Sequence, residues 1–154
     1  MKKFKFLLFA LISMTILACG GSDDTPPPTA EELKLIEIAG TGNGITWTAA
    51  SVTFEGSPSV DFDGMTLTLR TATSGETYSS TNGDPVFSSS GTFALNPTNL
   101  NQITIDGNSN NVFNITNLNS DASPATMTLT VNFTESGGTI EGTNGTYVFN
   151  LQHN

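Results

Sequence analysis

Cysteine and histidine are nearly absent from this chain, and each occurs once, as Cys19 and His153. A single cysteine cannot form a disulfide within the chain, so packing and strand pairing must stabilise the fold. Zinc sites need several Cys or His ligands, and a nucleophilic triad would need His153 held in order beside the chain end. We therefore expect no metal, no other cofactor and no triad chemistry.

Basic residues are also scarce, and three of the five stand at the start of the chain. Lys2, Lys3 and Lys5 precede an apolar run at residues 6–18. This run is too short for a membrane-spanning helix, which needs about 20 residues. Its length and its basic flank are typical of a secretory signal peptide.

The signal peptide would end at the only cysteine. Ile16-Leu17-Ala18-Cys19 resembles the bacterial lipobox, in which Leu and two small residues precede Cys; Ile16 and Leu17 depart from that pattern. The resemblance implies cleavage before Cys19, two acyl chains on its sulfur, one on its nitrogen, and anchoring in the outer membrane. Stable anchoring needs more than one acyl chain. A free thiol behind an ordinary signal peptide and an uncleaved apolar anchor are the alternatives.

An acidic stretch follows the cysteine, as Gly20-Gly21-Ser22-Asp23-Asp24. It resembles the export signal of surface lipoproteins of Bacteroidota, which follows their lipidated cysteine. The resemblance implies that Ser22, Asp23 and Asp24 direct the protein to the outer face of the cell. A merely soluble acidic tether is the alternative.

Cleavage would leave very little positive charge. Lys34 and Arg70 would be the only basic residues, against 14 acidic ones. Phosphate binding needs clusters of Lys and Arg, so we expect no nucleic acid as a partner. Electrostatic docking on anionic lipid is disfavoured for the same reason. The membrane is expected as a partner only through the anchor, and the sequence identifies no protein partner.

The chain divides into three segments by composition. Residues 1–18 are the expected signal peptide, and residues 19–29 are the lipidated cysteine with an acidic, proline-rich linker. Residues 30–154 are long enough for one domain with one modest core.

A short helix is predicted at the start of the domain. Thr29 and Glu32 fit a capping box, and Gly40 can end a helix, so we expect the helix over about residues 30–39. Because apolar residues also alternate here, a strand is the competing interpretation.

From residue 45 onward the period of apolar residues is two, which is typical of antiparallel strands with one buried face. The clearest runs are Met65/Leu67/Leu69, Met127/Leu129/Val131/Phe133 and Tyr147/Phe149/Leu151. The phase flips between Trp47 and Val52, which predicts a bulge near residues 49–51. Asn82-Gly83 and Asp106-Gly107 are strong hairpin signals.

These runs predict an all-β fold, a single antiparallel meander of about eight strands behind the short helix. A barrel and a two-sheet sandwich both explain the pattern. A short helix, then Gly42-Asn-Gly44-Ile-Thr-Trp47, then a meander resembles the lipocalin-like proteins, and this resemblance favours the barrel. Their first strand carries Gly-x-Trp, whereas this chain has Gly-x-x-Trp.

Paired carboxylates are the remaining catalytic option. Asp61 and Asp63 flank Phe62, and on a strand their spacing would be about 7 Å, within the range that glycoside hydrolysis uses. Asp-x-Asp-Gly more often precedes a turn, so we expect no enzyme. The run from Asp106 begins like a calcium loop but has Asn where that loop needs Gly and Glu. We interpret it as a polar hairpin tip.

Aromatic residues are the candidates for ligand binding, because exposed rings can stack on sugars. Trp47 is in phase with Ile45, which favours the core, and Tyr147 is in phase with Phe149. Tyr78 lies in a polar run and is the best surface candidate.

We therefore expect a non-enzymatic lipoprotein that binds an extracellular ligand, either a glycan or a small apolar molecule, in a barrel mouth or on a sheet face. The alternative is a structural or adhesive surface protein that acts through protein contacts.

Overall fold

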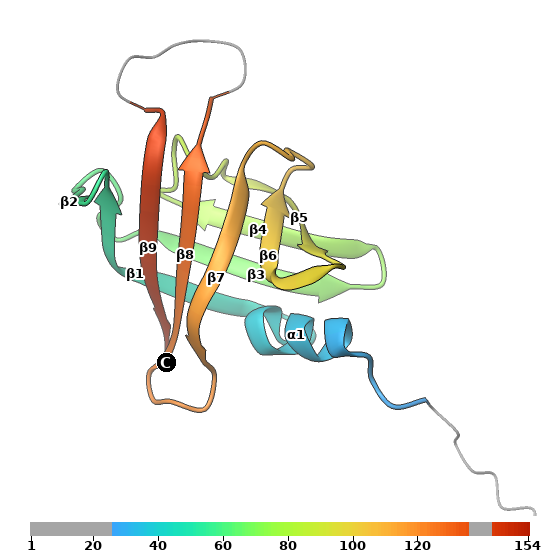
Figure 1. Ribbon diagram of the computed structural model, residues 1–154. Helices are drawn as coiled ribbons and strands as arrows, with labels where there is room; N and C mark the ends of the chain where they lie inside the picture. Colours follow the sequence, from blue (N-terminus) through green and yellow to red (C-terminus); the bar gives the residue numbers. More distant parts are fainter. Residues whose placement is uncertain (1–25, 136–142) are drawn as a thin grey trace, which may run out of the picture.

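The computed structural model describes residues 26–135 and 143–154. The expected signal peptide, Cys19 and the acidic residues Ser22, Asp23 and Asp24 lie outside these residues. Within them one helix precedes nine strands (Figure 1). The elements are α1 (Ala30–Ala39), β1 (Ile45–Phe54), β2 (Ser57–Pro58), β3 (Thr66–Ala72), β4 (Gly75–Thr81), β5 (Ser90–Asn96), β6 (Asn99–Ile105), β7 (Val112–Asn119), β8 (Ala125–Phe133) and β9 (Gly145–His153).

The strands form one antiparallel sheet that closes on itself. The order is β2-β1-β3-β4-β5-β6-β7-β8-β9, and β1 also pairs with β9. Apart from the two-residue β2, eight strands therefore make a closed up-and-down barrel. This confirms the all-β meander and decides for the barrel over the sandwich, consistent with a lipocalin-like architecture.

Closure depends on a bend in β1. Its first half pairs with β3, with Ile45 opposite Leu69, and its second half pairs with β9, with Phe54 opposite Tyr147. The register with β9 shifts between Ala49 and Ser51, which confirms the bulge predicted there. Because a bulge bends a strand and increases its twist, β1 can serve two neighbours in turn.

Helix α1 covers one end of the barrel, which we call the helix end. The Thr29 side chain accepts from the Glu32 N–H and the Glu32 side chain accepts from the Thr29 N–H, so the predicted capping box is present and the helix interpretation is confirmed. Ile38 is fully buried against the barrel, and its carbonyl accepts a 2.8 Å hydrogen bond from Trp47 Nε1. Among the described residues no helix is long and apolar enough to cross a membrane.

A glycine is required where the chain enters β1. Gly44 has φ 86°, a conformation that other residues rarely adopt, and a Cβ there would overlap the Leu69 carbonyl oxygen. This close approach explains the glycine ahead of Trp47.

The interior of the barrel is filled by side chains from the strands and from two connections at the opposite, distal end. Phe87, in residues 82–89, stacks on Phe113 with ring centres 5.0 Å apart and meets Phe149 edge-on at 5.2 Å. Phe62, in residues 55–65, meets Phe149 edge-on at 5.2 Å. Fully buried residues line the rest of the interior: Trp47, Met65, Leu67, Leu69, Ile103, Met127, Leu129 and Val131.

Both predicted hairpins are confirmed, because β4 pairs antiparallel with β5 and β6 pairs antiparallel with β7. Asp106 and Gly107 have φ 52° and 66°, and the Asn108 N–H donates to the Ile105 carbonyl, which makes a tight turn after β6. The hairpin at Asn82-Gly83 has a longer connection, because β5 begins only at Ser90. The longer connection is needed to carry Phe87 into the interior.

Because Phe87 fills the interior of the barrel, removing its ring should destabilise the fold. Phe87→Ala should lower the free energy of unfolding by about 3–5 kcal/mol, because it leaves a cavity among three aromatic rings. Val60→Ala is the matched control: Val60 is also in a distal connection but is 84% exposed, so its loss should cost less than about 0.5 kcal/mol. Urea unfolding measures both values, and similar small losses would contradict a filled interior.

Candidate functional site

Trp47 is in the core, as its phase with Ile45 predicts, and is 1% exposed. Its ring lies 5.9 Å from that of His153, and its indole nitrogen is bound to α1. The ring is therefore covered on the described surface and offers no face to a ligand.

Tyr78 corrects the sequence prediction, because it is 3% exposed rather than on the surface. It lies opposite Leu69 in the sheet and points inward with it. Its inward neighbours on β4 are the polar Glu76 and Ser80, so the run showed no alternation that would reveal a buried face. Neither aromatic ligand candidate is therefore presented to solvent.

The Tyr78 hydroxyl belongs to a polar clamp at the distal end. It donates to Asp106 Oδ2 at 2.7 Å, and Asp106 Oδ1 accepts from the Thr92 N–H at 2.8 Å. Burial, and then the hydrogen bond to Asp106, raise the pKa of Tyr78 to about 12. Gly91 permits this arrangement, since a Cβ there would overlap the Asp106 carboxylate. Asp106, which opens the run that begins like a calcium loop, therefore links the end of β6 to β4 and β5.

The carboxylate pair does not form a catalytic site on a strand face. Asp61 and Asp63 lie in a turn before β3 and are exposed on either side of the buried Phe62. The turn is closed by the Asp63 N–H to the Val60 carbonyl and by the Met65 N–H to the Phe62 carbonyl. Asp61 and Asp63 thus lie in a turn, as Asp-x-Asp-Gly favours, and not on a strand, since the chain turns here to insert Phe62. Within residues 26–135 and 143–154, no group of three or more His, Cys, Asp or Glu could hold a metal ion.

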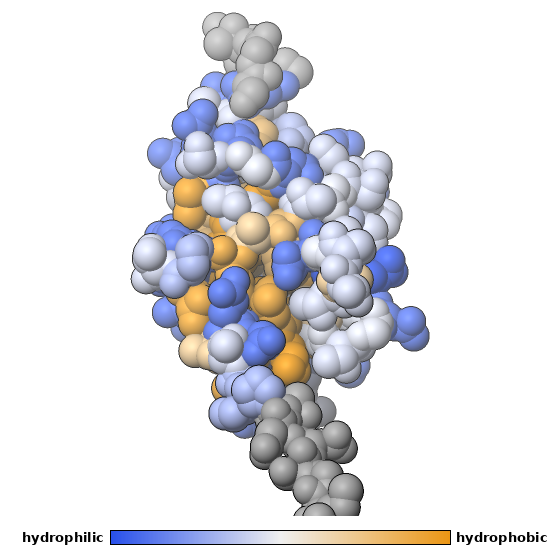
Figure 2. All heavy atoms as spheres, turned by 90° about the vertical axis from the view of Figure 1, so that its right-hand side faces the viewer, coloured by the Kyte–Doolittle hydropathy of each residue, from blue (hydrophilic) through white to orange (hydrophobic). Residues whose placement is uncertain are grey.

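The largest of the hollows described lies outside the barrel wall, at the helix end. We call it the helix groove: Ala30, Leu33, Lys34 and Glu37 of α1 face Leu100 and Asn101 of β6 across about 470 Å³. Its middle is apolar, with Leu33 54% exposed and Leu100 half-buried. Figure 2 shows apolar side chains gathered on the side of the molecule that contains α1, around a hollow with polar residues at its margin.

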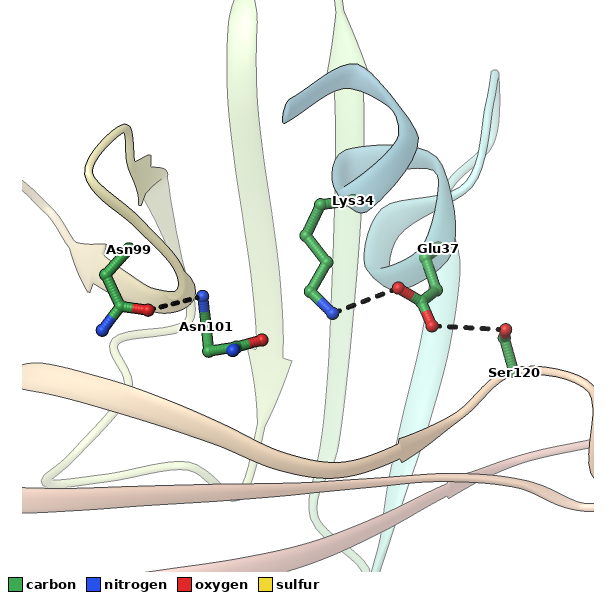
Figure 3. A network of polar contacts seen from close by, with 5 residues as sticks. All are labelled: Lys34, Glu37, Asn99, Asn101 and Ser120. Atoms are coloured by element: carbon green, nitrogen blue, oxygen red, sulfur yellow. Dashed lines mark hydrogen bonds and ion pairs between the residues drawn. The ribbon is translucent and has the colours of Figure 1, made fainter. Parts of the chain in front are cut away.

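Polar groups border the helix groove on two opposite sides (Figure 3). The Lys34 ammonium contacts Glu37 Oε2 at 3.1 Å, and Glu37 Oε1 accepts from the Ser120 hydroxyl at 3.5 Å. On the opposite side Asn99 Oδ1 accepts from the Asn101 N–H at 3.2 Å. An ammonium and a carboxylate thus lie on one side of the apolar groove and two amide side chains lie on the other.

The groove exists because α1 carries more apolar residues than it buries against the barrel. Ile38 and Ala39 are buried and Leu35 packs against the core, which leaves Leu33 and Ile36 exposed. The sequence analysis missed this site, although a single buried helix face needs fewer apolar positions than this helix has. That surplus was the available signal.

Two other hollows lie on the far side of α1 and in the barrel mouth. One of about 360 Å³ lies on the other side of α1, along Pro26, Pro28 and Ile36. The distal hollow measures about 150 Å³, and its buried Asn111 is already bound through both side-chain ends to the Thr134 backbone. The barrel mouth is therefore small and its buried amide is satisfied.

The Tyr78 clamp predicts a loss of stability at high pH. Because the folded state holds the Tyr78 proton to about pH 12 whereas an ordinary tyrosine loses it near 10.0, stability is fully present below pH 10 and falls as pH rises towards 12. Tyr78→Phe should lower the free energy of unfolding by about 1 kcal/mol at pH 8 and should reduce this alkaline fall. Urea midpoints at pH 8 to 11.5 measure it. Tyr147 contributes to the alkaline fall in the wild-type protein and in Tyr78→Phe alike. If the stabilities of the two proteins fall in parallel as pH rises, the hydrogen bond of Tyr78 to Asp106 does not contribute, and the clamp is ruled out.

The chain stands apart in comparisons with known proteins. No family model matches it, and no curated protein and no solved structure is significantly similar to it. The helix groove and the filled interior therefore carry the functional inference.

Proposed function

We propose that this chain is a non-enzymatic binding module that takes up a small amphipathic molecule in the helix groove. In this proposal the protein is held in the outer membrane by lipid on Cys19 and faces the cell exterior. The observation that supports it is an apolar groove of about 470 Å³ outside a barrel whose interior is filled.

The anchor rests on the start of the chain. A basic start, an apolar run of signal-peptide length and Ile16-Leu17-Ala18-Cys19 stand in the order that a lipoprotein requires. Ser22, Asp23 and Asp24 then support export to the outer face.

The lining of the groove supports the ligand class. Volumes of about 300–1,000 Å³ are usual for small-molecule sites. Leu33 and Leu100 would contact an apolar body, and burying such surface is worth about 25 cal/mol per Å². Lys34 can donate to an oxygen-bearing head, since an ammonium has three donors and Glu37 accepts from one. Of the described residues only Lys34 and Arg70 are Lys or Arg, so the placement of one in the groove is notable.

A glycan ligand has less support. Sugar binding on aromatic platforms needs exposed rings, and both Trp47 and Tyr78 are buried.

A structural or adhesive role is the alternative function. Assembly by strand addition would need an unpaired edge, and in the described part of the sheet the end strand is β2, two residues long.

A thermal-shift screen of residues 26–154 tests the proposal, with long-chain fatty acids, fatty alcohols and polysaccharides as probes. A ligand at 100 times its Kd adds about 2.7 kcal/mol, which raises the Tm of a domain of this size by on the order of 5–10 °C. We expect a shift with the amphipathic probes and a smaller one for Lys34→Met. Arg70→Met is the matched control, since Arg70 binds the Asn43 carbonyl away from the groove, and it should keep the full shift.

Three results would count against this function. A shift with polysaccharides alone would favour the glycan ligand, and no shift with any probe would favour the adhesive alternative. Equal losses in Lys34→Met and Arg70→Met would remove Lys34 from the site.

A further inference from the structure

Two exposed apolar side chains on α1 are not used by the fold. Leu33 is 54% and Ile36 is 46% exposed, one helical turn apart. Pro26 and Pro28 lie beside Ile36, and Leu100 lies across from Leu33. Together they expose apolar surface on both sides of α1 at the helix end, and exposed apolar surface of this kind can mark an interaction site.

The chain leaves the domain from this same surface. Residues 26–29 lead away from the start of α1, at the helix end and not at the distal end (Figure 1). Cys19 precedes Pro26 by seven residues, which span at most about 25 Å when fully extended. A lipid on Cys19 would therefore hold α1 close to the membrane, whereas the distal connections lie across the barrel from it.

The charges near α1 decide which lipid surface fits. Glu31, Glu32 and Glu37 accompany the single cation Lys34. Anionic headgroups would be repelled, so the attraction must come from apolar contact with a membrane of zwitterionic lipid.

We propose that the helix end of the barrel rests on the membrane, with Leu33 and Ile36 at the boundary between headgroups and acyl chains. The distal end then points away from the membrane, and the helix groove opens at the lipid surface. This orientation rests on the proposed lipid at Cys19 and does not depend on which molecule the groove binds.

The test places an environment-sensitive fluorophore on the mature, full-length protein in phosphatidylcholine vesicles. Ile36→Cys carries the label, and Leu33→Cys is a second position should the first disturb folding. Val60→Cys is the matched control, because Val60 is an exposed apolar residue at the distal end. We expect a blue shift and quenching by brominated lipid at positions 36 and 33, and water-like emission at position 60.

Each other outcome overturns the orientation. Water-like emission at all three positions would show that α1 stands off the membrane, and quenching at position 60 would show that the barrel is inverted or lies flat. In detergent without vesicles, a blue shift at position 36 that increases with protein concentration would show that a second copy of the protein, and not the membrane, covers this surface. Mass spectrometry of the same sample separates this proposal from the proposed function. An unmodified Cys19 would contradict the lipid anchor. An acylated Cys19 together with water-like emission at positions 33 and 36 would contradict the orientation alone.

Discussion

The pairing of β1 with β9 is the constraint on which the rest of the molecule depends. It joins the first long strand to the last, from Thr48 opposite Gln152 to Phe54 opposite Tyr147, and turns a meander into a barrel. Once the sheet is closed, every inward side chain faces the same enclosed space. The bulge at Ala49–Ser51 makes this possible, since β1 must turn from β3 to β9 part-way along.

Closure creates an interior, and the distal connections determine that it is full. Phe62 and Phe87 enter from these connections and complete an aromatic cluster with Phe113 and Phe149. At the other end Ile38 and Trp47 join α1 to the barrel. With this interior occupied, the ligand that we propose would bind outside the wall, where the surplus apolar residues of α1 are exposed.

Sequence reasoning predicted the parts of the fold that depend on local periodicity. The strands around Leu67, Leu129 and Phe149, the capping box at Thr29 and the bulge near Ala49 each leave a signal within about ten residues. Tyr78 was misplaced because its strand is polar on both faces, and the length of the 82–89 connection was missed because only the position of Phe87 in space explains it. The surplus of apolar residues on α1 signalled an exposed apolar face, but the helix groove also needs β6, some 65 residues away in the chain, and no local pattern could indicate that partner.

The central claim is that the ligand binds outside the barrel, between α1 and β6. Chemical-shift mapping by NMR tests it most directly, with residues 26–154 labelled with ¹⁵N and titrated with a fatty acid. The account predicts shifts at the amides of Leu33, Lys34 and Leu100 and little change at Phe87 and Phe113. Shifts concentrated at Phe87, Phe113 and Asn111, with α1 unchanged, would contradict it and return the site to the barrel mouth.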